Sequence, residues 1–375
     1  MKAVIMAGGK GTRLRPLTSN QPKPMISIAN KPCMEHIVNL LKRHGLEDIV
    51  TTLGFLPEVI EDYFGDGSAW DVKIEHSIEE EPMGTAGSIK LAEDKLTERI
   101  IVVSGDALTD ANLSRAVEFH EERGAEATLV LQQVDDPSEF GIVVVGDDGR
   151  VERFLEKPDP EEVFSYTANT GIYILEPEIL EEIPVDEEHD FADDLFPKLL
   201  EQGRPIYGYV TEKAYWEDIG NIDQYLDAQR AVLAGEVNGI ELPGEEVETG
   251  VFVGEGAEAP EEALEGPVIV GENASISTGA RVGPYTVLAP GVSVEPGARV
   301  VRSTVAEDTV IGENADLDGA LVGRVCKVGA EARLLKDSAL GDDVAVGEGA
   351  TVEAGVSIFP DKSVEDRETV SEDMT

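Results

Sequence analysis

Apolar residues in the first part of the chain follow two alternating patterns. Apolar runs of strand length cover residues 2–7, 48–53, 72–78, 99–103, 126–134, 141–145, 150–155, 170–175 and 206–210. Stretches with helical spacing lie between or after them, at residues 35–44, 58–64, 86–95, 112–123 and 221–235. Strands that alternate with helices form an α/β sheet with helices on both faces, and ligands sit at the carboxyl ends of its strands. We therefore expect residues 1–235 to form one α/β domain.

The second part of the chain has a period of six residues. Aliphatic residues stand at every sixth position in three runs separated by slips of one residue: Val270, Ile276, Val282, Leu288, Val294 and Val300; then Val305, Ile311 and Leu317; then Val322, Val328, Leu334, Leu340, Val346, Val352 and Ile358. Neither a helix nor a plain strand produces this spacing. It is typical of a parallel β-helix with one inward aliphatic residue per hexapeptide.

This half resembles the left-handed hexapeptide-repeat β-helix family, so we expect a left-handed β-helix over residues 266–375. The slips are expected to mark loops or bulges. Residues 236–265 are rich in Glu, Gly and Pro without a period and are expected to be a linker. The β-helix is expected to stabilise the protein or to mediate its oligomerisation, and a homo-oligomer is expected. An acyl-transferring site is the alternative, but such sites use a histidine and residues 236–375 contain none.

The composition is strongly acidic. Against 30 Lys and Arg stand 76 Asp and Glu, which gives a net charge of -46, and the excess occurs in both halves. Such a field repels polyanions, so nucleic acid and anionic membranes are not expected as partners. A solvated surface suited to high salt is the plainer interpretation. Two distant cysteines suit a reducing compartment, and no segment has the length of a membrane span. A soluble, cytoplasmic protein is expected.

A glycine-rich segment follows the first strand directly, and its sequence is AGGKGTRLRPLT. A glycine-rich turn at this place lets backbone N–H groups approach phosphates. The spacing fits neither the dinucleotide-binding G-x-G-x-x-G motif nor the P-loop. The segment PKPM follows it at residues 22–25.

Together these segments resemble the opening motif of the sugar-1-phosphate nucleotidyltransferases. The resemblance implies that the loop wraps the triphosphate through Gly8, Gly9, Gly11 and Thr12. It also implies that Arg13 contacts the leaving pyrophosphate and Lys23 the reacting phosphates. Taken alone, each would be an ordinary surface or loop cation.

The resemblance extends along the first half of the chain. The segment EPMGTAG at 81–87 matches the part that holds the nucleobase and ribose, which implies roles for Gly84 and Thr85. Asp106 in SGD and Asp218 in WEDIG match the carboxylates that bind Mg²⁺, and two carboxylates plus phosphates and water suit that ion. Asp110 is interpreted as a turn residue.

Three further segments resemble the family's sugar site. Phe140–Gly141 brings backbone close to the sugar, FLEKP supplies Glu156 for hydroxyls and Lys157 for the phosphate, and Asn169–Thr170–Gly171 supplies an amide and backbone contacts. Singly, Glu156 and Lys157 would be an exposed ion pair. The five histidines match no family site.

The predicted reaction joins a nucleoside triphosphate to a sugar 1-phosphate with Mg²⁺ and releases pyrophosphate. The GTAG and NTGIY segments and the appended β-helix resemble mannose-1-phosphate guanylyltransferases, which implies GTP and mannose 1-phosphate as substrates. Thymidylyl- and uridylyltransferases acting on glucose 1-phosphate remain alternatives. So does a non-catalytic, nucleotide-sugar-binding regulatory subunit, although the Arg, Lys and two Asp whose loss abolishes catalysis are present.

Overall fold

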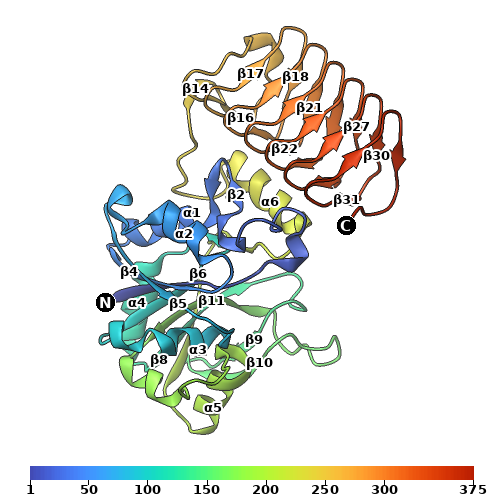
Figure 1. The fold of residues 1–375 in the computed structure, drawn as a ribbon. Coiled ribbons are helices and arrows are strands. Elements are labelled where there is room, and N and C mark those ends of the chain that lie inside the picture. Colours follow the sequence, from blue (N-terminus) through green and yellow to red (C-terminus); the bar gives the residue numbers. More distant parts are fainter. The chain divides into compact units, whose positions relative to one another are not determined.

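The computed structural model describes residues 1–375, which divide into two compact units (Figure 1). The first, here called the sheet unit, contains Met1–Gly9 and Cys33–Asp218. The second, the β-helix unit, contains Lys10–Pro32 and Ile219–Thr375. The glycine-rich segment is thus shared, because Gly8 and Gly9 belong to the sheet unit and Gly11 to the β-helix unit.

The sheet unit is built on a nine-stranded mixed sheet, in which seven strands follow the order β10-β9-β11-β6-β1-β4-β5 and β8 pairs with β11 and β12. Strands β4, β1 and β6 are parallel, and β11 runs antiparallel to β6. The strands are β1 (Lys2–Ala7), β4 (Asp48–Leu53), β5 (Lys73–Ile78), β6 (Ile100–Ser104), β8 (Ala127–Gln133), β9 (Ile142–Val145), β10 (Val151–Leu155), β11 (Thr167–Leu175) and β12 (Ile206–Val210).

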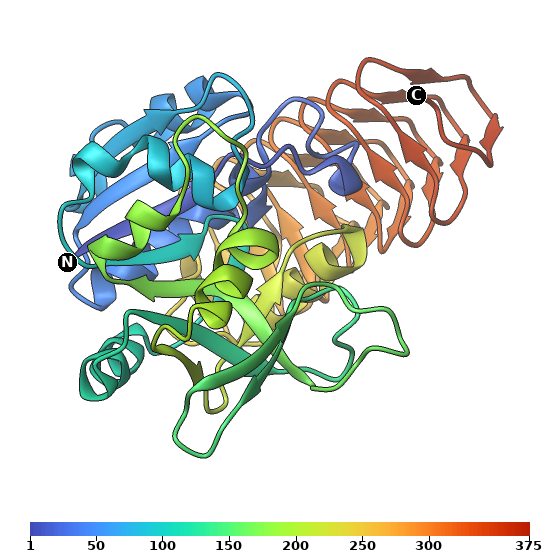
Figure 2. The ribbon, with the colours of Figure 1, turned by 90° about the horizontal axis from the view of Figure 1, so that it is seen from below.

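Helices cover both faces of this sheet (Figures 1 and 2). They are α1 (Cys33–Arg43), α2 (Pro57–Phe64), α3 (Gly84–Leu91), α4 (Leu113–Arg123) and α5 (Phe196–Glu201). On one face, apolar residues of α3 and α5 pack with alternate residues of the strands, such as Val4 and Val102. The predicted α/β fold is confirmed, and its expected strands and helices lie within a few residues of the observed ones. The compact unit is smaller than the expected residues 1–235, because residues 10–32 and 219–235 cluster with the β-helix.

A small two-stranded sheet lies outside the main one. It pairs β7 (Ala107–Thr109) with β13 (Trp216–Asp218) in antiparallel register, with Asp218 opposite Ala107. Strand β7 follows β6 after a short turn at Gly105, whose N–H donates to the carbonyl of Met6. This pairing brings the end of the sheet unit's chain back to the carboxyl end of β6.

The β-helix unit consists mainly of coils whose strands stack in three parallel sheets (Figure 1). The first sheet holds β15 (Val251–Val253), β16 (Val268–Val270), β19 (Thr286–Leu288), β22 (Thr304–Val305), β25 (Leu321–Val322), β28 (Ala339–Leu340) and β31 (Ser357–Ile358), with β14 (Glu245–Glu248) antiparallel at its edge. The second holds β17 (Ser275–Ile276), β20 (Ser293–Val294), β23 (Val310–Ile311), β26 (Lys327–Val328), β29 (Ala345–Val346) and β32 (Ser363–Val364). The third holds β18 (Arg281–Val282), β21 (Arg299–Val301), β24 (Asp316–Asp318), β27 (Arg333–Leu334), β30 (Thr351–Val352) and β33 (Thr369–Val370).

Every aliphatic residue of the six-residue series is buried in the core of these coils, which confirms the predicted β-helix. Successive coils approach closely: a Cβ on Gly271 would lie 2.4 Å from the carbonyl carbon of Ala289. The two slips are neither loops nor bulges. Stacked partners Ser275 and Ser293 are 18 residues apart, whereas Arg299 and Asp316 are 17 apart. Each slip is therefore a corner shortened by one residue.

The segment expected to be a linker, residues 236–265, is partly regular. It contains β14, β15 and the short 3-10 helix at Glu261–Ala263, and Val251 and Ala263 are buried in the β-helix core. Strand β14 runs antiparallel to β15, but the coil that starts at β15 has the usual length, since Val251 pairs with Val268 and Leu264 with Val282. Residues 251–265 thus complete the first coil.

The remaining parts of the β-helix unit are residues 10–32 and helix α6 (Ile222–Leu233). Residues 10–32 contain two 3-10 helices, at Thr12–Leu14 and Lys23–Met25, and a hairpin of β2 (Ser27–Ile28) and β3 (Lys31–Pro32). Ala29 and Asn30 both have positive φ, at 51° and 63°, as a two-residue type I′ turn requires.

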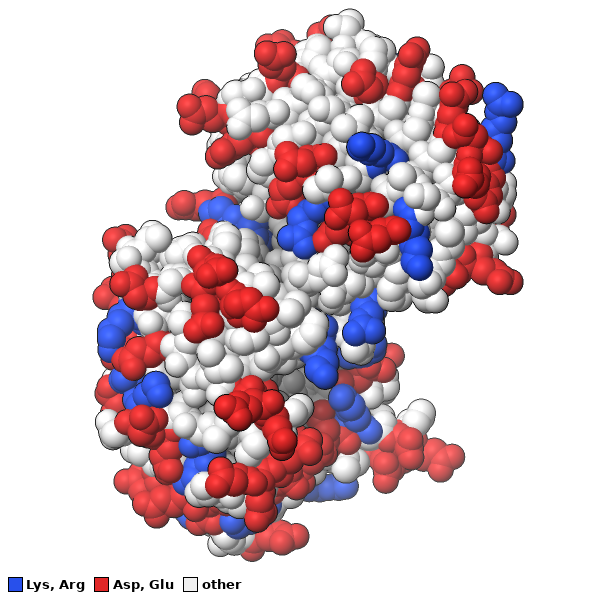
Figure 3. Space-filling view, viewed as in Figure 1, with Lys and Arg blue, Asp and Glu red and all other residues white.

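Acidic side chains are scattered over the surface of both units (Figure 3). This agrees with the even distribution of charge along the sequence. None of the helices is long and apolar enough to cross a membrane.

Candidate active site

The end of β1 in the sheet unit is crowded by a carboxylate. A Cβ on Gly8 would lie 2.8 Å from Oε1 of Glu79, and one on Gly54 would lie 2.6 Å from the same atom. The other carboxylate oxygen of Glu79 accepts the backbone N–H of Met83 at 3.3 Å. A side chain at residue 8 or 54 would therefore displace the carboxylate of Glu79 from its present position. By contrast, nothing lies within 4 Å of a Cβ on Gly9, so that backbone is open.

The two carboxylates predicted to bind metal are brought together by the small β7–β13 sheet. Asp106 ends the turn after β6, directly before Ala107, and Asp218 stands opposite Ala107 in the neighbouring strand. The hydroxyl of Ser104 donates to Oδ1 of Asp106 at 2.6 Å, which orients that carboxylate. No group of three or more His, Cys, Asp or Glu could hold a metal ion. The pair thus fits a hard cation that takes its other ligands from phosphates and water.

Asp110 has a different environment. Its carboxylate accepts the N–H of Tyr215 at 2.7 Å, and its own N–H donates to the carbonyl of Tyr215. These bonds fasten the strand that carries Asp218 to the strand after Asp106, and they agree with the interpretation of Asp110 as a turn residue.

The segment 83–87 is held by residues 187–191 rather than standing free. Gly84 has φ of 73°, and a Cβ there would lie 2.6 Å from the carbonyl oxygen of His189. The backbone and hydroxyl of Thr85 both donate to Asp190, at 3.0 and 2.7 Å, and the same hydroxyl accepts the N–H of Phe191. Thr85 therefore uses its N–H and its hydroxyl to fix the start of α3.

The three segments of the predicted sugar site also meet in the sheet unit. A Cβ on Gly141 would lie 2.4 Å from Oε2 of Glu156, so the glycine makes room for that carboxylate. The N–H of Asn169 donates to the carbonyl of Gly141 at 2.8 Å, and the N–H of Lys157 donates to that of Phe140. The side-chain amide of Asn169 donates to the hydroxyl of Tyr173 at 2.9 Å. Glu156 and Asn169 thus converge around Gly141.

Thr170 is buried, and its hydroxyl donates to the carbonyl of Val130 at 2.8 Å. Its carbonyl accepts the indole N–H of Trp216 at 3.1 Å, and Trp216 packs edge-on against Phe140 with centroids 5.0 Å apart. The side chain of Thr170 is therefore structural, and it ties the sugar segments to the strand that ends in Asp218.

Burial raises the pKa of the Glu156 carboxyl, and nearby Asp193 and Asp190 raise it further while Lys157 opposes them. Burial likewise raises the pKa of Glu79. Both carboxylates are thus held in poorly hydrated surroundings, where hydrogen-bond donors on a ligand would be strongly favoured.

Residues 11–23 belong to the β-helix unit and are closely packed around Gly11. Gly11 has φ of 61°, and a Cβ there would lie 2.9 Å from Cβ of Lys23. The hydroxyl of Thr18 donates to the carbonyl of Gly11 at 2.6 Å. The guanidinium of Arg13 lies against the start of α6, since a Cβ on Gly220 would be 3.0 Å from its Nη2. Thr12 and Arg13 are exposed. The aliphatic stem of Lys23 and the backbone at Gly11 therefore have fixed relative positions.

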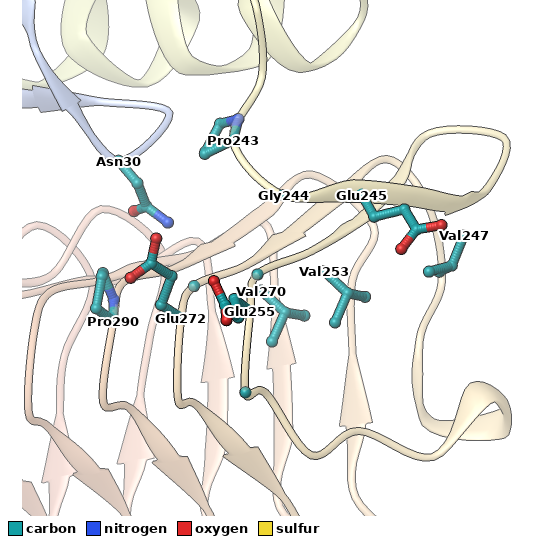
Figure 4. Close-up of a pocket in the computed structure, with 13 residues that line it drawn as sticks. Asn30, Pro243, Gly244, Glu245, Val247, Val253, Glu255, Val270, Glu272 and Pro290 are labelled. Carbon is teal, nitrogen blue, oxygen red and sulfur yellow. The ribbon is translucent and has the colours of Figure 1, made fainter.

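The β-helix unit also contains a pocket of about 730 Å³ (Figure 4). Its lining combines the turn at Asn30, the chain around Pro243, and the first coils, with Val253 and Val270 among its apolar residues. Glu245, Glu255 and Glu272 also line it. Three carboxylates without a cation disfavour phosphate, so this pocket does not suit the triphosphate.

Sequence reasoning missed Glu79, Asp190 and Trp216 as residues that shape the site. A run of three glutamates at 79–81 looks like a solvated surface, and only the fold places the first of them over Gly8 and Gly54. His120 has a structural role, because it is buried in α4 and its Nδ1 hydrogen-bonds to the hydroxyl of Thr128 at 2.8 Å.

Comparison with known proteins identifies both parts of the chain. The sequence model described as "Nucleotidyl transferase" matches residues 2–235, and the one described as "GMPPB C-terminal domain" matches residues 264–373. The chain is 40% identical over 343 residues to UTP–glucose-1-phosphate uridylyltransferase of a Synechocystis strain, covering 87% of this chain and 88% of the relative. It is 34% identical over 377 residues to mannose-1-phosphate guanylyltransferase 1 of Arabidopsis thaliana, covering 97% of both.

A mannose-1-phosphate guanylyltransferase of Mycobacterium tuberculosis is 35% identical over 311 residues, covering 80% of this chain and 83% of the relative. Among solved structures, HddC from Yersinia pseudotuberculosis complexed with GMP-PN superposes with a TM-score of 0.53 at 29% identity. It covers 62% of this chain and 99% of its own. That neighbour therefore matches only part of the chain described above.

Proposed function

Because the chain belongs to the nucleotidyl transferase family and is an enzyme with sugar-1-phosphate nucleotidyltransferase activity, we propose that it transfers GMP from GTP to mannose 1-phosphate. The products are GDP-mannose and pyrophosphate. The observation that carries the proposal is the pairing of Asp218 with Ala107, the residue after Asp106, which brings the two carboxylate residues close together at the carboxyl end of β6, the strand beside β1 and its glycine-rich turn.

The reaction needs no nucleophilic side chain. A phosphate oxygen of the sugar 1-phosphate forms a bond to the α-phosphorus of GTP, and the bond from that phosphorus to the oxygen bridging the β-phosphorus breaks. The electron pair leaves with pyrophosphate. The difficulty is electrostatic, because one anion attacks another. We propose that Arg13 and Lys23 neutralise the triphosphate and that Lys157 neutralises the sugar phosphate.

The family uses a divalent metal ion, and Mg²⁺ is the ion proposed. The carboxylates of Asp106 and Asp218 would hold it, and bound there it supplies positive charge to the phosphate oxygens. The Ser104 hydroxyl and the bonds from Asp110 to Tyr215 keep these two carboxylates in place.

The substrate contacts proposed for the other residues follow their local packing. Gly8, Gly9, Gly11 and Thr12 offer backbone to the triphosphate, and Gly84 offers backbone to the nucleoside while Thr85 fixes its position. Around Gly141, Glu156 accepts hydrogen bonds from sugar hydroxyls and the Asn169 amide donates to them. Thr170 has a structural role and holds this segment in place.

Glu79 supports guanine as the base. Its carboxylate presents only acceptors, lies between Gly8 and Met83, and has no cationic partner. Guanine offers two adjacent donors, its N1–H and its N2 amino group, whereas uracil and thymine offer one N–H between two carbonyl oxygens. A carboxylate would pair with the first edge and repel the second. The match of residues 264–373 to the GMPPB C-terminal domain supports the same choice.

A uridylyltransferase acting on glucose 1-phosphate is the second candidate. The 40% identity to a protein of that name is the observation that favours it. We retain guanine as the first choice because the carboxylate of Glu79 has two acceptor oxygens, and uracil offers only one N–H donor to them.

The decisive experiment measures pyrophosphate release with Mg²⁺ over a grid of nucleotides and sugars. GTP, UTP, dTTP, ATP and CTP are each tested with mannose, glucose and N-acetylglucosamine 1-phosphates. Release confined to GTP with mannose 1-phosphate supports the proposal, and release with UTP and glucose 1-phosphate supports the alternative. Silence in every combination from folded protein would overturn both and favour a regulatory nucleotide-sugar-binding subunit.

We also propose a cytoplasmic location and assembly into a homo-oligomer. Nucleoside triphosphate substrates and two buried cysteines that form no disulfide both suit a reducing interior. Sedimentation of the purified protein over a concentration series tests the assembly.

A further inference from the structure

Helix α6 carries a buried glutamine whose hydrogen bonds all go to one hairpin or to a supporting tyrosine. Gln229 is 3% exposed. Its Oε1 accepts the N–H of Ala29 at 2.9 Å, and its Nε2 donates to the carbonyl of Ser27 at 3.1 Å. Nε2 also donates to the hydroxyl of Tyr225 at 2.9 Å. A buried amide that is fully used in this way fixes the position of the β2–β3 hairpin against α6.

Tyr225 extends the same network to the β-helix. It is 4% exposed, and its hydroxyl donates to the carbonyl of Ser27 at 2.9 Å. Burial raises the pKa of this phenol to about 12, and the nearby Thr304 of β22 acts in the opposite direction, which places the phenol beside the coils. The hairpin tip has its own link, because the amide of Asn30 donates to the carbonyl of Leu288 in β19 at 2.9 Å.

The hairpin is only a few residues from the predicted phosphate-binding side chains. Lys23 precedes Ser27 across Pro24, Met25 and Ile26, all buried. Lys23 in turn packs on Gly11, and the guanidinium of Arg13 lies against Gly220 just before α6. Residues 10–32 therefore form one compact unit with α6 and the β-helix.

We propose that Tyr225 and Gln229 are positioning residues for the phosphate loop, here defined as residues 10–32, and that the β-helix works in catalysis as the support to which they fasten it. The proposal rests on the proposed function through the roles given to Arg13 and Lys23. It gives the β-helix a part in turnover beyond stabilisation or assembly.

The expected effect follows from the geometry of phosphoryl transfer, in which charge must be placed on the phosphates as they rearrange. A displacement of about 1 Å by a distant substitution can reduce turnover about 100-fold. Loss of the hydrogen bonds that Tyr225 and Gln229 make to the phosphate loop should therefore lower kcat more than it raises KM. The residues proposed to bind the sugar lie outside that loop.

The test uses the full-length protein with Gln229→Leu, which keeps the volume and removes all three hydrogen bonds, and Tyr225→Phe, which removes one hydroxyl. The matched control is Thr309→Val. Thr309 is fully buried in the β-helix, donates to the carbonyl of Gly323 at 2.8 Å and accepts the N–H of Cys326. It loses buried hydrogen bonds without touching the phosphate loop.

Two readouts are measured for each variant: kcat and KM for both substrates, and hydrogen exchange of peptides from residues 10–32 and 300–375. We expect Gln229→Leu to lower kcat by about 10- to 100-fold, with KM for the sugar phosphate within about threefold, and to speed exchange in residues 10–32 only. Tyr225→Phe should do the same to a smaller extent. Thr309→Val should keep the wild-type kcat.

Wild-type kcat in Gln229→Leu, or an equal loss in Thr309→Val, would overturn the proposal. If the unmodified protein transfers no nucleotide in any combination, the proposed function fails by itself. The exchange measurement then still tests whether Gln229 fastens the phosphate loop. Unchanged hydrogen exchange of residues 10–32 in Gln229→Leu rejects that role, and faster exchange supports it.

Discussion

Replacing Val325 by asparagine is expected to stabilise the β-helix. Val325 sits at a corner where each coil places one residue in the left-handed region. The residues stacked at this corner are Gly256, Asn273, Gly291, Asp308, Val325, Asp343 and Asp361, with φ between 55° and 73°. All but Val325 are of types that tolerate this conformation. A β-branched residue at positive φ is a steric outlier.

The magnitude follows from two opposing terms. A residue held in a sparsely populated region costs about 1–3 kcal/mol, and asparagine recovers much of this because its short polar side chain tolerates the left-handed region. Val325 is 48% exposed, so removing it forfeits at most about half of the roughly 1.5 kcal/mol gained by burying a valine fully. The net gain is therefore about 1 kcal/mol, which for a unit of this size corresponds to about 2–4 °C in Tm.

Thermal unfolding followed by calorimetry measures the change, with Val310→Asn as the matched control. Val310 is 38% exposed and lies in strand β23, where the backbone is extended and valine is favoured. The same substitution there should lower Tm. A Tm in Val325→Asn at or below that of the unmodified protein would show that the corner exerts no strain on valine and would refute the reasoning.

Three further predictions concern the site. Arg13→Ala should reduce kcat by about 1,000-fold or more, by analogy with lost transition-state cations; wild-type-like turnover would remove Arg13 from the mechanism. Glu79→Gln should lower the kcat/KM preference for GTP over UTP by roughly 5- to 150-fold, the range for losing one paired contact to a base edge; an unchanged ratio would exclude Glu79 as the selecting residue. Glu156→Gln should raise Tm near pH 7 while lowering kcat/KM for the sugar phosphate. The folded pKa of Glu156 is raised, so its contribution to stability is complete below the unfolded pKa and is lost as pH rises through the folded one. The gain in Tm should accordingly vanish near pH 4, and a gain that persists there would contradict the assignment to charge burial.

The fold was predictable where one periodic signal covered many residues. The aliphatic series from Val270 to Ile358 specifies the inward face of every coil, because any residue facing that narrow core must be apolar and of limited size. The first coil was missed because its inward positions at Val253, Ala259 and Leu264 are only partly buried and include a small alanine, so the aliphatic signal is weak there. The two slips were misread, because the spacing of five residues from Val300 to Val305 and from Leu317 to Val322 means one residue fewer, whereas a bulge or loop would add one.

The candidate site was predictable where a motif alone implied the chemistry. Asp106 and Asp218 were named from their segments, and the structure adds that an antiparallel pair of strands brings them together. Glu79 and Gln229 were not predictable, because a polar residue in an acidic run or on a helix reads as solvent-exposed. Their importance depends on what the fold packs against them, Gly8 and Gly54 for Glu79 and the hairpin at Ser27 for Gln229.

The β-helix unit is made of two segments that are far apart in the sequence, so its parts are synthesised at different times. Residues 10–32 emerge first, yet the bond from Ala29 to Gln229 spans 200 residues and that from Asn30 to Leu288 spans 258. At about 5–20 residues per second, the hairpin waits roughly 10–50 s for its partners to be synthesised. During that time Ala29 and Asn30 lack the hydrogen bonds that hold them in the finished protein. The hairpin can therefore take its final place in the β-helix unit only after residue 288 has been made, when more than three quarters of the chain is complete.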